Sequence, residues 1–129
     1  MSLKEMLSIM VVDDHISSRM LTVDALKEMG ITNLHIAKDG REAFTKLANC
    51  PVHLLITDLY MPEIDGFKLI QAVRTNPSIK GMAIIILTGK KDANVVNIAG
   101  KLGVNNVLSK PFSSLQLKDA IESIVGRLN

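Results

Sequence analysis

Five short runs of apolar residues, each followed by a helix-forming stretch, place the strongest constraint on the fold of this 129-residue chain. Runs that are apolar throughout, without alternating polar residues, are typical of strands buried on both faces of a parallel sheet. The strands are expected at residues 8–12, 34–37, 54–57, 83–87 and 106–109. Because helical crossovers between parallel strands are right-handed, the alternation predicts a doubly wound α/β sheet of five strands and five helices.

The helices are predicted from apolar residues that recur every three or four positions. In the first helix, over residues 16–29, five apolar residues are expected to face the sheet: Ile16, Met20, Val23, Leu26 and Met29. The second helix is expected at residues 41–48, the third after Gly66, and the fourth from an N-cap at Asp92. A capping box formed by Ser113 and Gln116 predicts the start of the last helix.

Composition excludes several classes of protein. The net charge of +2, spread along the chain, gives no electrostatic footprint for nucleic acid. No apolar run approaches the ~20 residues that span a membrane. A single cysteine, Cys50, cannot form an internal disulfide, which suits a reducing compartment such as the cytoplasm. The length predicts one domain, residues 1–129, with its core at about residues 8–128.

Polar side chains follow four of the five predicted strands. Asp13 and Asp14 come after the first strand, Asp58 after the third, Thr88 after the fourth and Lys110 after the fifth. In a doubly wound sheet, ligands bind outside the carboxyl ends of the strands. We therefore expect three carboxylates, a hydroxyl and an ammonium group to meet at one edge of the sheet.

Three carboxylates at one edge require either protonation or a cation. A pair at ~4 Å repels by about 4 kcal/mol at an effective dielectric constant of 20. Carboxylate oxygens favour Mg²⁺, or Mn²⁺, over softer metals, and protein-bound Mg²⁺ is commonly completed by a phosphate. Lys110 and Thr88 suit that phosphoryl group, one by charge and the other by a hydrogen bond. Asp58 is then the predicted nucleophile, which forms an acyl phosphate.

Short motifs carry a resemblance to a known family. They follow one another in this order: Val11-Val12-Asp13-Asp14, Asp58-Leu59-Tyr60-Met61-Pro62, Asp65-Gly66, Thr88-Gly89 and Lys110-Pro111-Phe112. With these motifs in place, the chain from Ile9 to about Leu128 resembles the bacterial response-regulator receiver domain of two-component signalling, in its CheY-like single-domain form. The resemblance implies a flavodoxin-like fold with the strand order 2-1-3-4-5.

The resemblance also implies a role for each acidic residue. Asp58 would be the phosphoacceptor. Asp14 and Asp58 would bind Mg²⁺ directly together with the backbone carbonyl of Tyr60, and Asp13 would help through a water molecule. Tyr60 and Lys90 occupy variable positions that flank the phosphoryl site in this family, where they would tune dephosphorylation.

The family pattern assigns the switch to the last two strands. Lys110 would pair with the phosphoryl group, Thr88 would move toward it, and the Lys110-Pro111 peptide bond would be cis. Receivers commonly have Tyr or Phe three residues before the lysine, and here that residue is Val107. An aromatic rotamer switch therefore cannot operate in its usual form, and we expect the loop after Thr88 and the helix after Asp92 to respond instead.

The resemblance implies a signalling protein and no enzyme acting on a separate substrate. The phosphoryl donor would be a histidine kinase, a phosphotransfer protein or a small molecule such as acetyl phosphate. Receivers catalyse their own phosphorylation and slow dephosphorylation. The output partner would be a protein that binds the surface formed by the last two helices and the fifth strand, on a monomer or a weak dimer.

Other interpretations stay open at this point. The chain could be a pseudo-receiver that binds partners without phosphorylation, or a receiver cut from a larger regulator. A haloacid-dehalogenase-type phosphatase needs an aspartate two residues after its nucleophile, where this chain has Tyr60. A flavodoxin would bind the phosphate of FMN after the first strand, where Asp13 and Asp14 would repel it. The histidines, at positions 15, 35 and 53, are not spaced as a metal set, although His15 borders the acidic pair.

Overall fold

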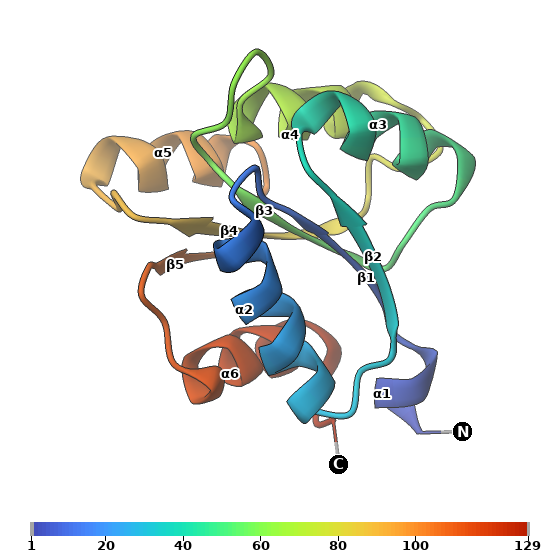
Figure 1. The fold of residues 1–129 in the computed structure, drawn as a ribbon. Helices are drawn as coiled ribbons and strands as arrows, with labels where there is room; N and C mark the ends of the chain where they lie inside the picture. Colours follow the sequence, from blue (N-terminus) through green and yellow to red (C-terminus); the bar gives the residue numbers. More distant parts are fainter. Residues whose placement is uncertain (1, 129) are drawn as a thin grey trace.

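A parallel sheet of five strands forms the centre of the fold in a computed structural model that describes residues 2–128 (Figure 1). The strands are β1 (Ser8–Val12), β2 (Asn33–Ala37), β3 (Leu54–Asp58), β4 (Ala83–Thr88) and β5 (Asn106–Ser109). Their order across the sheet is β2-β1-β3-β4-β5, and every neighbouring pair is parallel. The predicted doubly wound α/β fold and its strand order are confirmed.

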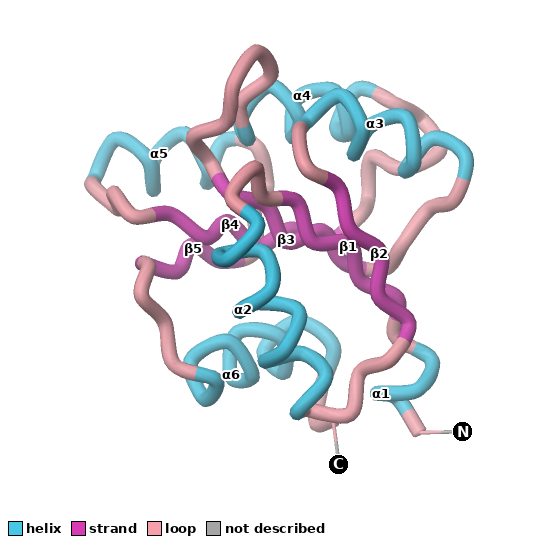
Figure 2. Tube along the Cα trace, in the orientation of Figure 1, coloured by secondary structure: helices cyan, strands magenta, loops and turns pink. Residues whose placement is uncertain are grey.

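Helices cover both faces of the sheet, as the cyan segments of Figure 2 show. They are α1 (Leu3–Met6), α2 (Ile16–Glu28), α3 (Gly40–Asn49), α4 (Gly66–Thr75), α5 (Ala93–Lys101) and α6 (Ser114–Val125). One face packs against α3, α4 and α5, and the other against α2 and α6. Each face therefore has its own hydrophobic core, and the central strands contribute alternate side chains to the two cores.

Burial explains why the central strands are apolar throughout. All residues of β1 and β3 are buried, because helices cover both of their faces. The pairing register places Val12 beside Thr57 and Asp58 beside Leu87. The ends of β1, β3 and β4 therefore meet at one edge of the sheet, which is where the site residues follow.

Helix α2 differs from its predicted inward face. Val23 and Leu26 are buried as expected, but Ile16 is 68% exposed and Met20 is 46% exposed. Three-residue steps cover only about 300° at 3.6 residues per turn, so a stripe built mostly from such steps rotates around the helix. Thr22 and Ala25 complete the buried face instead.

The ends of the helices follow local chemistry closely. Asp92 caps α5 by accepting a hydrogen bond from the backbone N–H of Val95, and Ser113 and Gln116 form the expected capping box on α6. The structure adds one element that the sequence did not indicate, the single turn α1, which has no buried residue. Among the described residues, no helix combines the length and the apolar character that a membrane crossing requires.

Candidate functional site

The polar residues that follow the strands converge at the carboxyl edge of the sheet. Asp13 and Asp14 continue directly from β1, and Asp58 is the last residue of β3. Thr88 ends β4, and Lys110 follows β5. Candidate ligand atoms of Asp13, Asp14 and Asp58 lie within 4.8 Å of one another in a group that also includes His15.

Lys110 is the cation at the centre of this cluster. Its ammonium group donates a hydrogen bond to Asp13 Oδ2 at 3.0 Å and lies 3.6 Å from Asp58 Oδ1. A third contact, at 2.8 Å, joins Lys110 Nζ to the hydroxyl of Ser18 on α2. One ammonium group therefore faces three carboxylates, so the site carries an excess of negative charge.

Asp13 is held on every side by the surrounding chain. Its Oδ1 accepts a hydrogen bond from the backbone N–H of His15 at 3.0 Å, while its Oδ2 accepts the bond from Lys110. Its backbone carbonyl accepts a bond of 2.7 Å from the guanidinium of Arg19. These contacts fix Asp13 as a positioned, almost fully buried carboxylate.

Asp58 is buried, and only one of its two carboxylate oxygens has a partner among the described residues. Its Oδ1 accepts a hydrogen bond of 2.8 Å from the backbone N–H of Leu59. Its Oδ2 accepts no hydrogen bond from the residues that the structure describes. Gly66, the first residue of α4, packs against this strand end so closely that an added Cβ would lie 2.5 Å from the carbonyl oxygen of Asp58.

The two buried aspartates differ in their affinity for protons. Burial raises the pKa of Asp58; the charge of Lys110 opposes this increase and the charges of Asp13 and Asp14 add to it. Burial also acts to raise the pKa of Asp13, but the Ser18 hydroxyl, the His15 backbone N–H and Lys110 outweigh it, and the pKa of Asp13 is lowered. The folded structure therefore favours the ionised form of Asp13 and disfavours the ionised form of Asp58.

Asp14 has one carboxylate oxygen without a hydrogen-bond donor among the described residues. Its Oδ1 is shielded from solvent and accepts no hydrogen bond from the described residues. A buried carboxylate oxygen without a donor is costly unless a cation binds it. This oxygen, the free Oδ2 of Asp58 and the surplus of negative charge fit a hard divalent cation such as Mg²⁺.

The other predicted residues surround this centre. Thr88 is buried, and its hydroxyl accepts a hydrogen bond from the backbone N–H of Lys90. Tyr60, two residues after Asp58, is 54% exposed. The Lys110–Pro111 peptide bond is cis. Val107 lies on β5, away from the acidic cluster, and lines a groove of about 280 Å³ beside α5.

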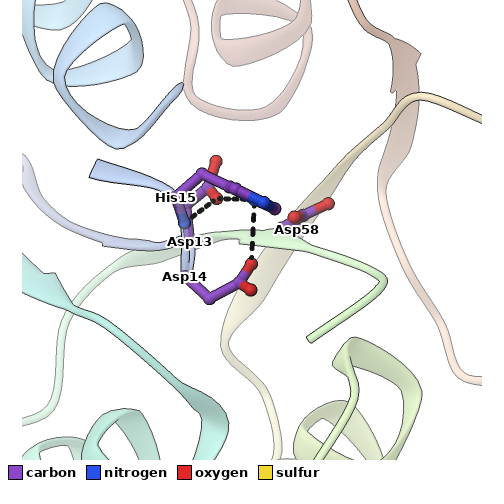
Figure 3. Close-up of side chains that lie close together, drawn as sticks. All are labelled: Asp13, Asp14, His15 and Asp58. Atoms are coloured by element: carbon purple, nitrogen blue, oxygen red, sulfur yellow. Dashed lines mark hydrogen bonds and ion pairs between the residues drawn. The ribbon is translucent and has the colours of Figure 1, made fainter. Parts of the chain in front are cut away.

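Sequence reasoning missed two residues of α2, Ser18 and Arg19, and identified His15 only as a neighbour of the acidic pair. Ser18 and Arg19 bind Lys110 and Asp13, and His15 points its ring toward the acidic cluster (Figure 3). The Nδ1 atom of His15 lies 3.3 Å from Asp14 Oδ1 and 3.8 Å from Asp13 Oδ1. Its place directly after the aspartate pair was the one available signal, whereas Ser18 and Arg19 become recognisable only after the helix is folded against the sheet.

Comparison with known proteins identifies the family. The model of the response regulator receiver domain matches residues 9–122. The chain belongs to this family. The match extends over all five strands and includes every residue of the acidic cluster and Lys110. The predicted resemblance is therefore confirmed, and the protein is a signalling receiver domain.

Individual relatives resemble this receiver over nearly its whole length. The probable chemotaxis protein CheY of Rhizobium etli is 44% identical over 128 residues, which are 99% of each chain. The chemotaxis protein CheY1 of Helicobacter pylori is 36% identical over 121 residues, 93% of this chain and 98% of that one. The crystal structure of the Vibrio cholerae chemotaxis protein CheY4 at pH 4.0 superposes with a TM-score of 0.85 at 29% identity, covering 92% of this chain and 98% of that one.

Proposed function

We propose that this receiver accepts a phosphoryl group on Asp58 from a histidine kinase, a phosphotransfer protein or a small donor such as acetyl phosphate. One observation carries the proposal. Asp58 is a buried carboxylate that has one unbonded oxygen, and it lies between an ammonium group and two further aspartates. Asp13, by contrast, accepts hydrogen bonds on both of its carboxylate oxygens.

The transfer is a substitution at phosphorus. One oxygen of the Asp58 carboxylate attacks the donor phosphorus, an O–P bond forms, and the P–N bond of a phosphohistidine or the P–O bond of acetyl phosphate breaks. The leaving group departs with the electron pair of that bond, and a departing imidazole takes up a proton.

The remaining acidic residues would hold Mg²⁺, with Mn²⁺ as a substitute. Asp14 and Asp58 would bind it directly with the backbone carbonyl of Tyr60, and Asp13 would bind it through a water molecule. When bound, the ion supplies positive charge to the phosphoryl oxygens. The unsatisfied Oδ1 of Asp14 supports this assignment.

Lys110 and Thr88 would bind the transferred group. In the structure Lys110 pairs with Asp13 and Asp58, so it would exchange its contact with Asp58 for a phosphoryl oxygen. The hydroxyl of Thr88 would leave the N–H of Lys90 and donate to the same group. This exchange pulls on the loop between β4 and α5, and it thereby couples Asp58 to the output surface.

That surface is formed by α5, β5 and α6. Because Val107 provides no aromatic ring, we propose that the signal passes through the exposed β4–α5 loop and through α5 itself, of which only Val95 and Ala99 are buried. A downstream protein would bind this surface with an affinity that depends on Asp58. Tyr60 and Lys90 flank the site and would set the lifetime of the phosphoryl group, which the receiver slowly hydrolyses.

We infer that residues 1–129 form a single receiver domain that works in the bacterial cytoplasm as a monomer or weak dimer. This chain and the R. etli relative each cover 99% of the other, which supports one domain over the given residues. A pseudo-receiver, in which Val107 marks the loss of switching, is the second candidate.

Intact-mass measurement after incubation with acetyl phosphate separates the two candidates. The native chain should gain one phosphoryl group in the presence of Mg²⁺ and none in the presence of chelator. Asp58→Asn should gain none, while Asp24→Asn, an exposed aspartate on α2, should behave as the native chain does. Modification of Asp58→Asn at the native level would contradict the phosphoacceptor assignment, and absence of both adduct and Mg²⁺ binding in the native chain would favour the pseudo-receiver.

A further inference from the structure

His15 lies on the rim of the acidic cluster with its ring turned inward. Its Nδ1 is 3.3 Å from the unsatisfied Oδ1 of Asp14, and its candidate ligand atom belongs to the same 4.8 Å group as the oxygens of Asp13 and Asp58 (Figure 3). The hydrogen bond from the His15 backbone N–H to Asp13 Oδ1 fixes the position of this residue relative to the site.

The other two histidines have their ring nitrogens engaged elsewhere. His53 Nδ1 is bonded to the backbone N–H and the hydroxyl of Ser8, and His35 Nε2 contacts the side chain of Asn33. The ring of His15 forms no hydrogen bond with the described residues and is 72% exposed. A cation at the cluster would therefore bind this ring without breaking a hydrogen bond that the ring already forms.

We propose that His15 is a nitrogen ligand of the divalent cation in this receiver, which gives the site a preference for Co²⁺ and similar transition metals over Mg²⁺. The proposal rests on the metal site of the proposed function and adds the selectivity of that site. Three carboxylates alone form a hard oxygen site, which suits Mg²⁺ and Mn²⁺. An imidazole nitrogen bound to the same ion favours later transition metals such as Co²⁺, Ni²⁺ and Zn²⁺ over Mg²⁺, because imidazole is a softer ligand than a carboxylate.

The His15 ring is placed so that its Nδ1 atom and Asp14 Oδ1 could contact the same ion. Asp14 Oδ1 and His15 Nδ1 are neighbours that form no hydrogen bond with each other, so both lone pairs are available to one ion between them. A chain with an apolar residue at position 15 would keep the three carboxylates and lose only the nitrogen. Replacement of His15 should therefore weaken the binding of Co²⁺ more than it weakens the binding of Mg²⁺.

The test compares metal binding in the native chain, His15→Phe and the matched control His35→Phe. Phenylalanine keeps a planar ring and removes the donor atoms. Calorimetric titration should show that Co²⁺ binds at least about tenfold more weakly to His15→Phe than to the native chain. The affinity for Mg²⁺ should change by less than about threefold, since the oxygen ligands are intact. His35→Phe should match the native chain for both ions.

Pulsed electron paramagnetic resonance of the Mn²⁺ complex gives the direct signature. A nitrogen coupling from a bound imidazole should be present in the native chain and in His35→Phe, and absent in His15→Phe. A native complex without nitrogen coupling, or equal Co²⁺ affinities in native and His15→Phe chains, overturns the role of His15 and leaves the Mg²⁺ site standing. If the native chain bound neither Mg²⁺ nor Co²⁺, this result would overturn both the metal site of the proposed function and this inference.

Discussion

At the scale of single residues, ionisation of Asp58 and of Asp13 is expected to have opposite effects on the free energy of unfolding. The pKa of Asp58 is raised above the ordinary value of 3.8, so the folded chain binds this proton more tightly than the unfolded chain. Ionisation of Asp58 therefore destabilises the fold as the pH rises from 3.8 through that raised pKa. The positive charge of Lys110 offsets part of this destabilisation, because Lys110 Nζ lies 3.6 Å from Asp58 Oδ1.

We predict that Asp58→Asn is more stable than the native chain at neutral pH, by about 1–2 kcal/mol. Asparagine keeps an Oδ1 acceptor for the N–H of Leu59 and removes the buried charge. Thermal unfolding measured in the absence of divalent cations should show this difference at pH 7 and lose it at acidic pH, where native Asp58 is protonated. Addition of Mg²⁺ should narrow the gap, since the ion stabilises the native carboxylates by binding. Equal melting temperatures at pH 7 without cation would contradict the raised pKa.

Asp13→Asn should have the opposite effect. The pKa of Asp13 is lowered below 3.8, so its stabilising contribution is complete above that value and is lost as the pH falls through the lowered pKa. The substitution removes the charge that pairs with Lys110 at 3.0 Å, and we expect a loss of about 1–3 kcal/mol at neutral pH. Urea unfolding at pH 7 tests this expectation. A stability equal to that of the native chain would show that the Lys110 pair contributes nothing.

At the scale of the elements, the start of α4 is packed directly against the end of β3. A Cβ on Gly66 would lie 2.5 Å from the Asp58 carbonyl oxygen and 2.9 Å from Leu59 Cα. Both of these are backbone atoms, which cannot move aside as a flexible side chain would. The glycine therefore sets how closely α4 approaches the strand that carries the phosphoacceptor.

Gly66→Ala should destabilise the fold by about 1–3 kcal/mol and slow phosphorylation of Asp58, because the clash displaces the strand end. Gly100→Ala is the matched control. An added Cβ at Gly100, within α5, has no neighbour within 4 Å, and alanine there should stabilise the helix by up to about 1 kcal/mol. Chemical unfolding and the rate of acetyl phosphate labelling provide the two measurements. Native-like labelling by Gly66→Ala would show that the close packing has no effect on the site.

The elements also show what sequence reasoning could and could not supply. Strands were predictable because β1, β3 and β4 are buried runs, and caps were predictable because Asp92 and Ser113 act on the N–H groups of near neighbours. The predicted inward face of α2 was right at Val23 and Leu26 but wrong at Ile16 and Met20, because mostly three-residue spacings rotate around a helix. Long-range contacts such as the bond from Lys110 to Ser18 depend on the packed tertiary structure, and no local pattern encodes them.

At the scale of the whole molecule, the sheet is unevenly buried. The strands β1 and β3 are buried along their length, whereas no residue of β5 is fully buried and the loop from Gly89 to Asp92 is exposed. Segments with few buried contacts open at lower free energy than the core. The α5–β5 side is therefore the part of the molecule that a change at Asp58 can move most easily.

Hydrogen exchange with and without beryllofluoride, a mimic of the phosphoryl group, should localise that movement. We expect the change in amide protection to concentrate in residues 89–109, because Thr88 and Lys110 border this segment on both sides. Helix α3, which lies near β2 at the opposite edge of the sheet from β5, should show no change. Changes confined to the loops around Asp58, with none in α5 or β5, would contradict the proposed output surface.

Tyr60 gives this molecule an intrinsic optical reporter. The chain has no tryptophan and a single tyrosine, and that tyrosine is half-exposed two residues from Asp58. Its ultraviolet emission therefore comes almost wholly from one ring beside the acidic cluster. Any event there that alters the solvation or quenching of this ring is visible in the unlabelled protein, so its kinetics can be followed without attaching a dye.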